Sequence, residues 1–129
     1  MSSFLYQGCL DSFAKGRINF SKDRFKVLLV DGYVPDLSHK YRSEISGEIS
    51  GQGYTPGGFP VPVTVSGSTV TLTGFTAKDS TIKARAAVYY KDGGGPMLDL
   101  LVAHIDFSEE VVSKDGPFTL TDSTLRLET

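Results

Sequence analysis

Apolar and polar residues alternate over much of this chain, and a two-residue period of this kind is typical of β-strands. Residues 25–30 are apolar on both faces, which predicts a central strand that ends at the Asp31-Gly32 turn. Residues 61–72 alternate on either side of a Ser66-Gly67 turn, so they predict a hairpin whose outer face carries threonines. A further strand is expected to begin at residues 18–20, before a polar turn.

The second half of the chain predicts a longer hairpin. Residues 82–90 form one strand, residues 92–96 form a glycine-rich turn, and residues 98–107 return with apolar residues on both faces. Residues 74–80 and 108–116 are expected to be connections. One or two closing strands are expected to contain Phe118, Leu120, Leu125 and Leu127. In the strand expected at residues 82–90, one side is expected to carry Ile82, Ala84, Ala86, Val88 and Tyr90.

Residues 3–15 follow a helical period instead. The positions i, i+3, i+4 and i+7 are occupied by Tyr6, Cys9, Leu10 and Phe13, which would form one apolar stripe. Ser2 or Ser3 can cap the start of this helix, and Gly16 can end it in the left-handed conformation. The stripe must cover the domain's own sheet or dock on a neighbouring subunit. Cys9, the single cysteine, excludes an intramolecular disulfide and is expected to be a small core residue.

The order of these elements predicts the fold class. Turn signals recur roughly every 8–12 residues and about seven or eight strands are expected, which is typical of antiparallel sandwiches. At 129 residues the chain is long enough to bury a hydrophobic core without a disulfide or a metal. We therefore expect a mainly β fold, an antiparallel β-sandwich of jelly-roll type with one N-terminal α-helix. Residues 1–129 are expected to form this single domain.

Charge and hydropathy exclude several kinds of partner. The formal net charge of −2 gives no overall attraction to nucleic acid or to membranes. Residues 15–26 are locally basic, but apolar residues are interleaved there, so solvent-facing positions are favoured over a nucleic-acid arm. No apolar run approaches the roughly 18–20 residues of a membrane helix, and the N-terminus lacks a signal-peptide pattern. We expect no nucleic-acid or membrane partner, and folding in a reducing cytoplasm.

Residues 44–60 contain five of the fourteen glycines. Their spacing does not match the dinucleotide fingerprint, no Gly-Lys-Ser/Thr follows, and no helix is expected after them to bind phosphate. We therefore expect no nucleotide or other cofactor. The stretch is predicted to be an ordered, extended loop that Tyr54 and Phe59 hold in place and that reaches a neighbouring subunit.

Candidate catalytic or metal-binding residues are few. His104 and Asp106 are two residues apart on an expected strand and so share one face, but a metal site or an acid–base pair needs a third partner. His39 lies in a loop after Asp36 with no convergent spacing. Structural or surface histidines are the favoured interpretation, and we expect no catalytic residue and no metal site. A small hydrolase or metal protein is kept as a third possibility.

Aromatic residues in expected loops are candidates for a protein interface. Four of them lie between residues 32 and 62, where a self-contained domain would prefer polar side chains. Such residues can anchor a partner, or they can pack the loop against its own sheet, and both interpretations stay open. Together with the helix stripe, the candidate interface residues are Tyr6, Phe13, Tyr33, Tyr41, Tyr54 and Phe59.

Four parts of the sequence recur, in the same order, in one known family. They are Phe25–Val30, Glu48–Gly58, Ser80–Asp92, and Ile105–Phe107 followed by Gly116–Leu120. With these segments the chain resembles small β-rich virion structural proteins of tailed bacteriophages and prophages, over roughly residues 4–127. The family supplies no catalytic residues. The short connection at residues 93–96 departs from the usual pattern, which puts any role of that loop in doubt.

The resemblance implies a function in the virion. Some similar proteins are capsid cement, or decoration, proteins, so the chain is expected to stabilise the phage head by bridging major capsid proteins. Self-association as dimers or higher oligomers is also expected, as is location in the virion after synthesis in the host bacterial cytoplasm. The helix at residues 3–15 and the loop at residues 44–60 are the expected contact surfaces. The alternative is a tail- or fibre-associated module that binds the host.

Overall fold

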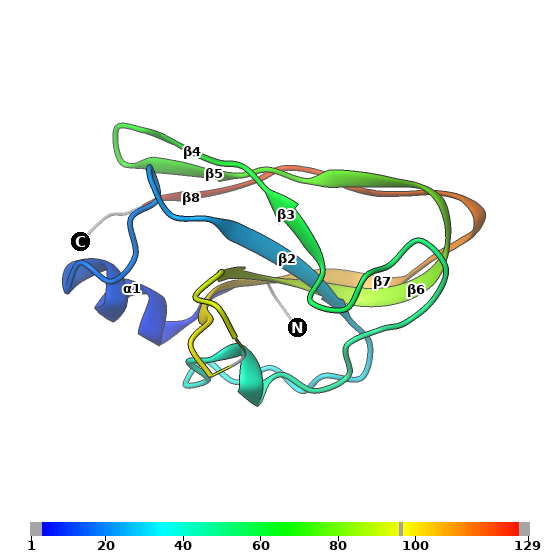
Figure 1. Ribbon diagram of the computed structural model, residues 1–129, viewed down its shortest axis with the longest axis horizontal. Coiled ribbons are helices and arrows are strands. Elements are labelled where there is room, and N and C mark those ends of the chain that lie inside the picture. Colours follow the sequence, from blue (N-terminus) through cyan, green and yellow to red (C-terminus); the bar gives the residue numbers. More distant parts are fainter. Residues whose placement is uncertain (1–3, 96, 127–129) are drawn as a thin grey trace.

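Two antiparallel β-sheets and one short helix make up the structure, a computed structural model that describes residues 4–95 and 97–126 (Figure 1). The five-stranded sheet has the order β1-β7-β6-β2-β3, with β1 Phe4–Leu5, β7 Leu100–Leu120, β6 Phe75–Lys91, β2 Phe25–Val30 and β3 Phe59–Val61. The three-stranded sheet has the order β4-β5-β8, with β4 Val63–Ser66, β5 Thr69–Leu72 and β8 Ser123–Arg126. The predicted mainly β, sandwich-like fold with an N-terminal helix is therefore confirmed.

The N-terminal helix is shorter than predicted. Helix α1 covers Gln7–Ala14, because Phe4 and Leu5 form β1 and pair with the edge of β7 instead. The backbone N–H of Tyr6 continues this pairing by donating to the carbonyl of Val102 at 3.1 Å. A helix from residue 3 is thus wrong at its start, and the expected serine caps lie outside the described residues. The helix ends as predicted, since Gly16 has a φ of 75°.

Cys9 is a core residue, as the helical stripe predicts. Its side chain is completely buried in the cluster between the sheets, and burial raises the pKa of its thiol to about 12. The thiol therefore stays protonated and shielded in the folded protein.

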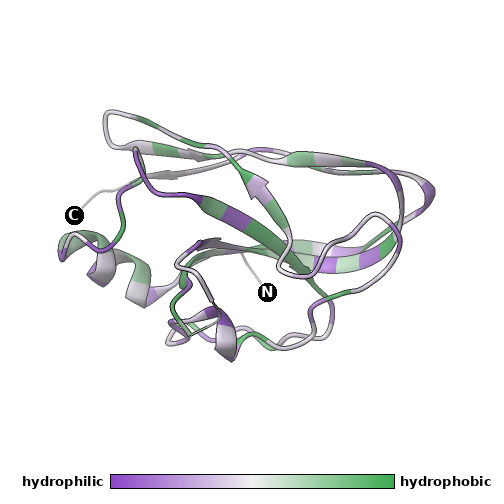
Figure 2. Ribbon diagram, in the orientation of Figure 1, coloured by the Kyte–Doolittle hydropathy of each residue, from purple (hydrophilic) through white to green (hydrophobic). Residues whose placement is uncertain are grey.

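Strand β2 is buried on both faces, which confirms the prediction of a central two-sided strand. Val27 and Leu29 face the cluster between the two sheets, whereas Leu28 and Val30 face a second cluster on the opposite side. Figure 2 shows β2 coloured as hydrophobic over most of its length. The second cluster is covered by the chain that follows β2, which runs beneath the five-stranded sheet in Figure 1 and contributes Tyr33.

Strands β6 and β7 form one long hairpin that belongs to both layers. Figure 1 shows it passing from the upper layer around one end of the molecule into the lower layer. The connections expected at residues 74–80 and 108–116 are wrong, because residues 75–80 and 108–116 are strand. Register shifts between Ala77 and Ser80 and between Ala84 and Ala86 accompany the bend, and Ser108 has a positive φ of 67°. These irregularities interrupt the alternation while the pairing continues.

The bend also changes which positions of β6 face the cluster between the sheets. Ala84 contributes to the cluster between the sheets, but Ala86 contributes to the cluster on the opposite side. The prediction that residues 82–90 present alternate positions to one side is therefore wrong. Likewise Phe118 and Leu120 lie in the last part of β7 and do not form a separate closing strand. Leu125 lies in β8, whereas Leu127 is outside the described residues.

The strand expected at residues 18–20 is a turn. The carbonyl of Asn19 accepts the N–H groups of Lys22 and Asp23, and the Asp23 carboxylate accepts the N–H of Asn19 at 2.7 Å. Ile18 and Phe20 are nevertheless buried. The alternation of apolar and polar residues in this stretch therefore reflects burial of the side chains and not strand pairing.

The hairpin expected over residues 61–72 forms between β4 and β5, with Ser66 opposite Thr69 around the turn at residues 67–68. Val61 is not part of it, because it ends β3 in the other sheet. The chain therefore changes sheets at Pro62, between β3 and β4.

A buried pair of hydroxyls stabilises the bend of the long hairpin. The Ser80 and Ser113 hydroxyls are hydrogen-bonded at 2.7 Å, and both side chains are buried. Ser80 also donates to the carbonyl of Gly116 at 3.0 Å, while Ser113 accepts the N–H of Ile82 at 3.3 Å. These bonds satisfy backbone groups that the register shifts remove from the regular ladder.

We predict that Ser113→Ala lowers the free energy of unfolding by about 1–3 kcal/mol, because the buried N–H of Ile82 loses its acceptor. Urea unfolding measures the change. Thr119→Val is the matched control, since Thr119 shares an exposed hydroxyl pair with Thr76 at 3.2 Å and should change stability by about 0.5 kcal/mol or less. Equal effects of the two substitutions would contradict the role given to the bend.

Candidate functional site

The glycine-rich stretch packs on its own sheet. It follows the short 3₁₀ helix η1 (Arg42–Glu44) and leads into β3, with isolated bridges that pair Glu48 with Val30 and Gln52 with Thr81. Gly58 has a φ of +88°, and a Cβ atom there would lie 1.9 Å from the carbonyl oxygen of Val27. The loop therefore needs glycine because its backbone lies directly against β2.

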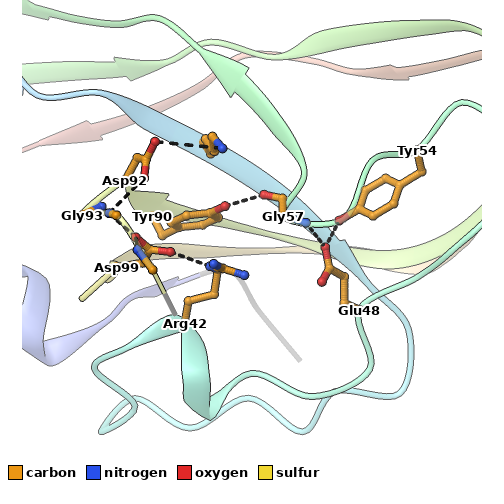
Figure 3. A network of polar contacts seen from close by, with 11 residues as sticks. Arg42, Glu48, Tyr54, Gly57, Tyr90, Asp92, Gly93 and Asp99 are labelled. Carbon is orange, nitrogen blue, oxygen red and sulfur yellow. Dashed lines mark hydrogen bonds and ion pairs between the residues drawn. The ribbon is translucent and has the colours of Figure 1, made fainter. Parts of the chain in front are cut away.

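Two tyrosines and one carboxylate hold this loop (Figure 3). The Tyr54 hydroxyl donates to Oε2 of Glu48 at 2.6 Å and accepts the N–H of Leu29 at 3.2 Å. The same Glu48 oxygen accepts the N–H of Gly57 at 2.7 Å, and the Tyr90 hydroxyl donates to the Gly57 carbonyl. Burial raises the pKa of Tyr54, and the hydrogen bond to Glu48 raises it further. Tyr54 is therefore a neutral donor at physiological pH.

A partly buried ion pair lies beside the loop. Nε of Arg42 donates to Oδ2 of Asp99 at 2.6 Å, and the Arg42 guanidinium lies over the ring of Tyr90 at 5.2 Å. The other Asp99 oxygen accepts the N–H groups of Gly93 at 2.7 Å and Gly95 at 3.4 Å. Asp99 is only 1% exposed, so these donors replace the water that a carboxylate would otherwise bind. The pair fixes the β6–β7 turn against η1.

These groups border an open cleft of about 380 Å³ between the glycine-rich loop and the β6–β7 turn. Its charged lining residues are Lys26, Arg42, Glu48, Asp92 and Asp99. Lys26 lies 3.9 Å from Asp92, so cations and carboxylates are largely matched within the cleft. The cleft is a polar, internally paired surface, which suits hydrogen bonding to a partner better than capture of a strongly charged ligand.

His104 and Asp106 do share one strand, and with Arg85 they border a cavity of about 70 Å³. His104 is buried, and burial lowers the pKa of its imidazole although Asp106 acts in the opposite direction. Its ring lies 5.8 Å from that of Tyr33. Within residues 4–95 and 97–126, no three His, Cys, Asp or Glu side chains are grouped closely enough to hold a metal ion.

His39 belongs to the same neighbourhood, which the sequence does not indicate. The Tyr33 hydroxyl is hydrogen-bonded to Nδ1 of His39 at 2.7 Å and to the hydroxyl of Tyr6 at 3.0 Å. Tyr33 therefore links the loop after β2 to the start of α1. This polar chain connects Tyr33 and His39 to Tyr6, which lies 27 residues before Tyr33 in the sequence.

The six candidate interface aromatics divide into three groups. Tyr6, Tyr33 and Tyr54 are buried in the chain's own core, so the structure does not present them to a partner. Tyr41 and Phe59 are half-buried, and the Phe59 ring stacks on Phe75 with centroids 4.2 Å apart. Of the six, Phe13 is the exposed one. Packing against the own sheet is therefore the correct interpretation for the buried tyrosines.

Aliphatic residues provide the exposed apolar surface instead. Four of them lie on two loops, and their exposed fractions are 77% for Val34, 45% for Leu37, 77% for Met97 and 63% for Leu98. We call these four side chains the apolar loop residues. Val34 and Leu37 lie inside an expected polar connection, which was the available indication in the sequence. Leu98 was expected to begin a strand, but β7 starts at Leu100.

Backbone hydrogen bonds join the two loops and the start of α1, which lie side by side in Figure 1. The Leu37 carbonyl accepts the N–H of Gln7 at 3.0 Å, and the Lys40 carbonyl accepts the N–H of Leu101 at 2.9 Å. The N–H of Arg42 donates to the carbonyl of Asp99 at 2.9 Å. The apolar loop residues are thus carried by a braced backbone.

No family model, curated protein or solved structure matches this chain. Among the described residues, no helix has the length and hydropathy needed to span a membrane.

We predict that Asp99→Ala lowers the free energy of unfolding by about 3–5 kcal/mol, because it leaves the Arg42 charge and the turn N–H groups without their acceptor. Urea unfolding gives the magnitude, and hydrogen exchange should show faster exchange at residues 93–95. Glu110→Ala is the control, since the exposed Lys83–Glu110 pair at 3.7 Å should contribute about 0.5 kcal/mol or less. A small effect of Asp99→Ala would exclude the ion pair as the brace.

We also predict that stability decreases above pH 10. Burial raises the pKa of Tyr89 and Tyr90 to about 12, whereas a tyrosine in the unfolded chain ionises near pH 10. Between these pH values the unfolded state loses protons first, so each tyrosine should cost on the order of 2 kcal/mol of stability by pH 12. Urea unfolding from pH 8 to 11.5 tests this, and Tyr89→Phe should flatten the profile. An unchanged profile in that variant would contradict the assignment.

Proposed function

We propose that this protein is a structural component of a bacteriophage virion, and that it acts as a capsid cement protein bridging major capsid proteins. The observation that carries the proposal is the set of apolar loop residues, exposed on two loops that are firmly attached to the sheet. The resemblance of the sequence to small phage virion proteins supplies the class of partner.

The chemistry of these loops suits a protein partner. Large aliphatic side chains on a soluble domain are stabilised when a complementary surface removes them from water. The paired charges of the neighbouring cleft provide a polar border of the kind found around interfaces. A shell presents many copies of the same capsid surface, so a modest interface per copy is multiplied by avidity.

Rigidity strengthens this proposal. The Arg42–Asp99 pair and the backbone bonds between the loops order the apolar loop residues before any partner binds. Ordering a loop during binding costs free energy, and a preordered surface avoids that cost. Self-association of neighbouring copies on the shell accompanies this role in our proposal.

The alternative of a host-binding module on a tail or fibre receives less support when the ligand is a glycan. Glycan recognition by Tyr33, Tyr41 and Tyr54 would need exposed rings along a groove. Tyr33 and Tyr54 are buried and Tyr41 is half-buried. The exposed apolar surface is aliphatic, which favours a protein partner.

We predict that Met97→Asp and Leu98→Asp each weaken binding to assembled capsids at least about tenfold, because a carboxylate would be buried against an apolar partner. Co-sedimentation with purified shells measures the binding. Val112→Asp is the matched control, since Val112 is also exposed but lies on β7 away from these loops, and it should bind normally. Mass spectrometry and imaging of virions give the location. Absence from particles, or a position on the tail alone, would refute the cement function.

A further inference from the structure

Strand β4 is an edge strand with unusual properties. In the part of the chain that the structure describes, it pairs only with β5, on one side. Its four residues, Val63–Ser66, carry no charge and contain no proline. Natural proteins usually blunt such edges with charged residues, proline or very short strands, because unpaired backbone groups attract another strand.

The other edges are treated differently. β1 has only two residues, and the three-residue β3 has Pro60 at its centre. β8 ends with Arg126. Within the described ranges, β7 past residue 104 pairs only with β6, and this edge carries Asp106, Glu109 and Glu110. Among these edges, β4 lacks such protective features.

The ladder with β5 shows which backbone groups of β4 point outward. The carbonyl of Pro62 accepts the N–H of Thr73 at 3.4 Å, which makes this a hydrogen-bonded pair. Because such pairs alternate along an antiparallel ladder, Thr64 and Ser66 bond to β5. The N–H and C=O groups of Val63 and Val65 point away from β5. Within the described residues, these four groups have no hydrogen-bond partner.

Pro62 does not block this edge, because its ring nitrogen faces β5. The N–H that a proline lacks would have been donated to the carbonyl of Thr73. The Tyr89 hydroxyl donates to that carbonyl instead, at 3.2 Å. The missing donor is thus compensated inside the molecule, and the outer side of β4 keeps its full set of groups.

The side chains on β4 also lack a neighbour. Val65 lies opposite Val70, which is completely buried, yet Val65 itself is 40% exposed. Both valines project toward the same side of the sheet as the core residue Leu72. Val65 remains exposed because β4 has no strand on its outer side. A strand added there would cover it.

The sequence of β4 favours a second copy of the same strand. Val63-Thr64-Val65 reads identically in both directions about Thr64. We propose that β4 pairs antiparallel with β4 of a second copy, across a two-fold axis that passes between the two Thr64 residues. The two three-stranded sheets then become one continuous six-stranded sheet.

This register satisfies all of the outward backbone groups. Val63 forms a hydrogen-bonded pair with the partner's Val65, and Val65 does so with the partner's Val63, so the two pairs contain about four hydrogen bonds. Thr64 faces the partner's Thr64 as a non-hydrogen-bonded pair, where side chains approach closely. Shifting the register by two residues in either direction would leave half of the valine groups unpaired. The symmetric arrangement is isologous and closes at two copies.

An open trough lies beside the start of β4. It has a volume of about 620 Å³, and its lining residues include Phe20, Ser21, Arg24, Pro60, Pro62 and Val63. In the proposed register the partner's turn at residues 67–68 is directed toward this trough. The trough therefore leaves room for the partner's hairpin at the end of the paired strands.

The pairing deepens the self-association that forms part of the proposed function, but it is tested on the isolated chain in solution. Its failure would leave capsid binding through the apolar loop residues untouched. Conversely, a chain that forms this dimer but does not bind shells would refute only the cement function.

The test is a disulfide at the axis. Thr64→Cys places two thiols at a non-hydrogen-bonded pair, where the Cα separation of roughly 4.5 Å is suitable for a disulfide. The native Cys9 is completely buried and should not compete. Under mild oxidation at high protein concentration, we expect Thr64→Cys to form a covalent dimer, detected by intact mass and non-reducing electrophoresis.

Thr71→Cys is the matched control. Thr71 lies directly opposite Thr64 on β5, so its thiol is on the same face but one strand farther from the axis. Its symmetric mates would be too far apart for a disulfide, and we expect at least about tenfold less dimer. Equal yields from the two variants would indicate random collision and overturn the proposal. So would a monomeric Thr64→Cys protein whose new thiol reacts freely with a thiol reagent.

A charge at the axis provides an independent measurement. Thr64→Lys places two ammonium groups opposite each other, so sedimentation equilibrium should show association weakened at least about tenfold relative to the unmodified chain. Thr71→Lys should associate as the unmodified chain does. A chain that stays monomeric at all concentrations would overturn the proposal, and would indicate that β4 receives an extended segment of another protein.

Discussion

The continuous pairing of β6 with β7 is the interaction on which the rest of the structure depends. One hairpin supplies the centre of the five-stranded sheet and then bends into the other layer, so the two layers are connected by paired backbone. β1 and β2 attach to its lower part. The buried Ser80–Ser113 contact lets the hairpin bend without leaving backbone groups unsatisfied. Without that bend, the hydrophobic faces of the two layers would not meet.

The five-stranded sheet is buried on both faces, and this burial constrains the segments that cover it. One face meets the other sheet, and the opposite face is covered by the loop after β2 and by Tyr6. The glycine-rich stretch covers the edge of β2, where the N–H of Ile49 donates to the carbonyl of Leu29. Irregular backbone over a sheet must find hydrogen bonds, and Tyr54, Glu48 and Tyr90 provide them. Glycines allow the backbone to approach at the required distance. The stretch that most resembles a ligand cradle in the sequence is therefore a structural cover.

This use of the aromatics determines where partners can bind. Tyrosines that could have anchored a partner are buried in the core. The apolar loop residues and the unprotected edge of β4 remain at the surface. These two features are of different kinds, since one offers apolar side chains and the other offers backbone hydrogen bonds. In the proposed function, the first kind of surface would bind the capsid protein and the second would bind a further copy of the chain.

The sequence by itself determined the fold class, the two-sided β2, the β4–β5 hairpin, the left-handed Gly16 and the buried Cys9, because each depends on a local period or on one residue's conformational range. Only the tertiary structure decided that Phe4 and Leu5 form a strand, since this depended on a free edge of β7 nearly one hundred residues away. It also decided that residues 75–80 and 108–116 remain paired, because register shifts break the alternation without breaking the ladder. The roles of the candidate site residues were equally non-local. The sequence around a tyrosine in an irregular segment is the same whether the side chain faces a partner or its own sheet. Only the positions of β2 and β6 determined that Tyr33 and Tyr54 are buried.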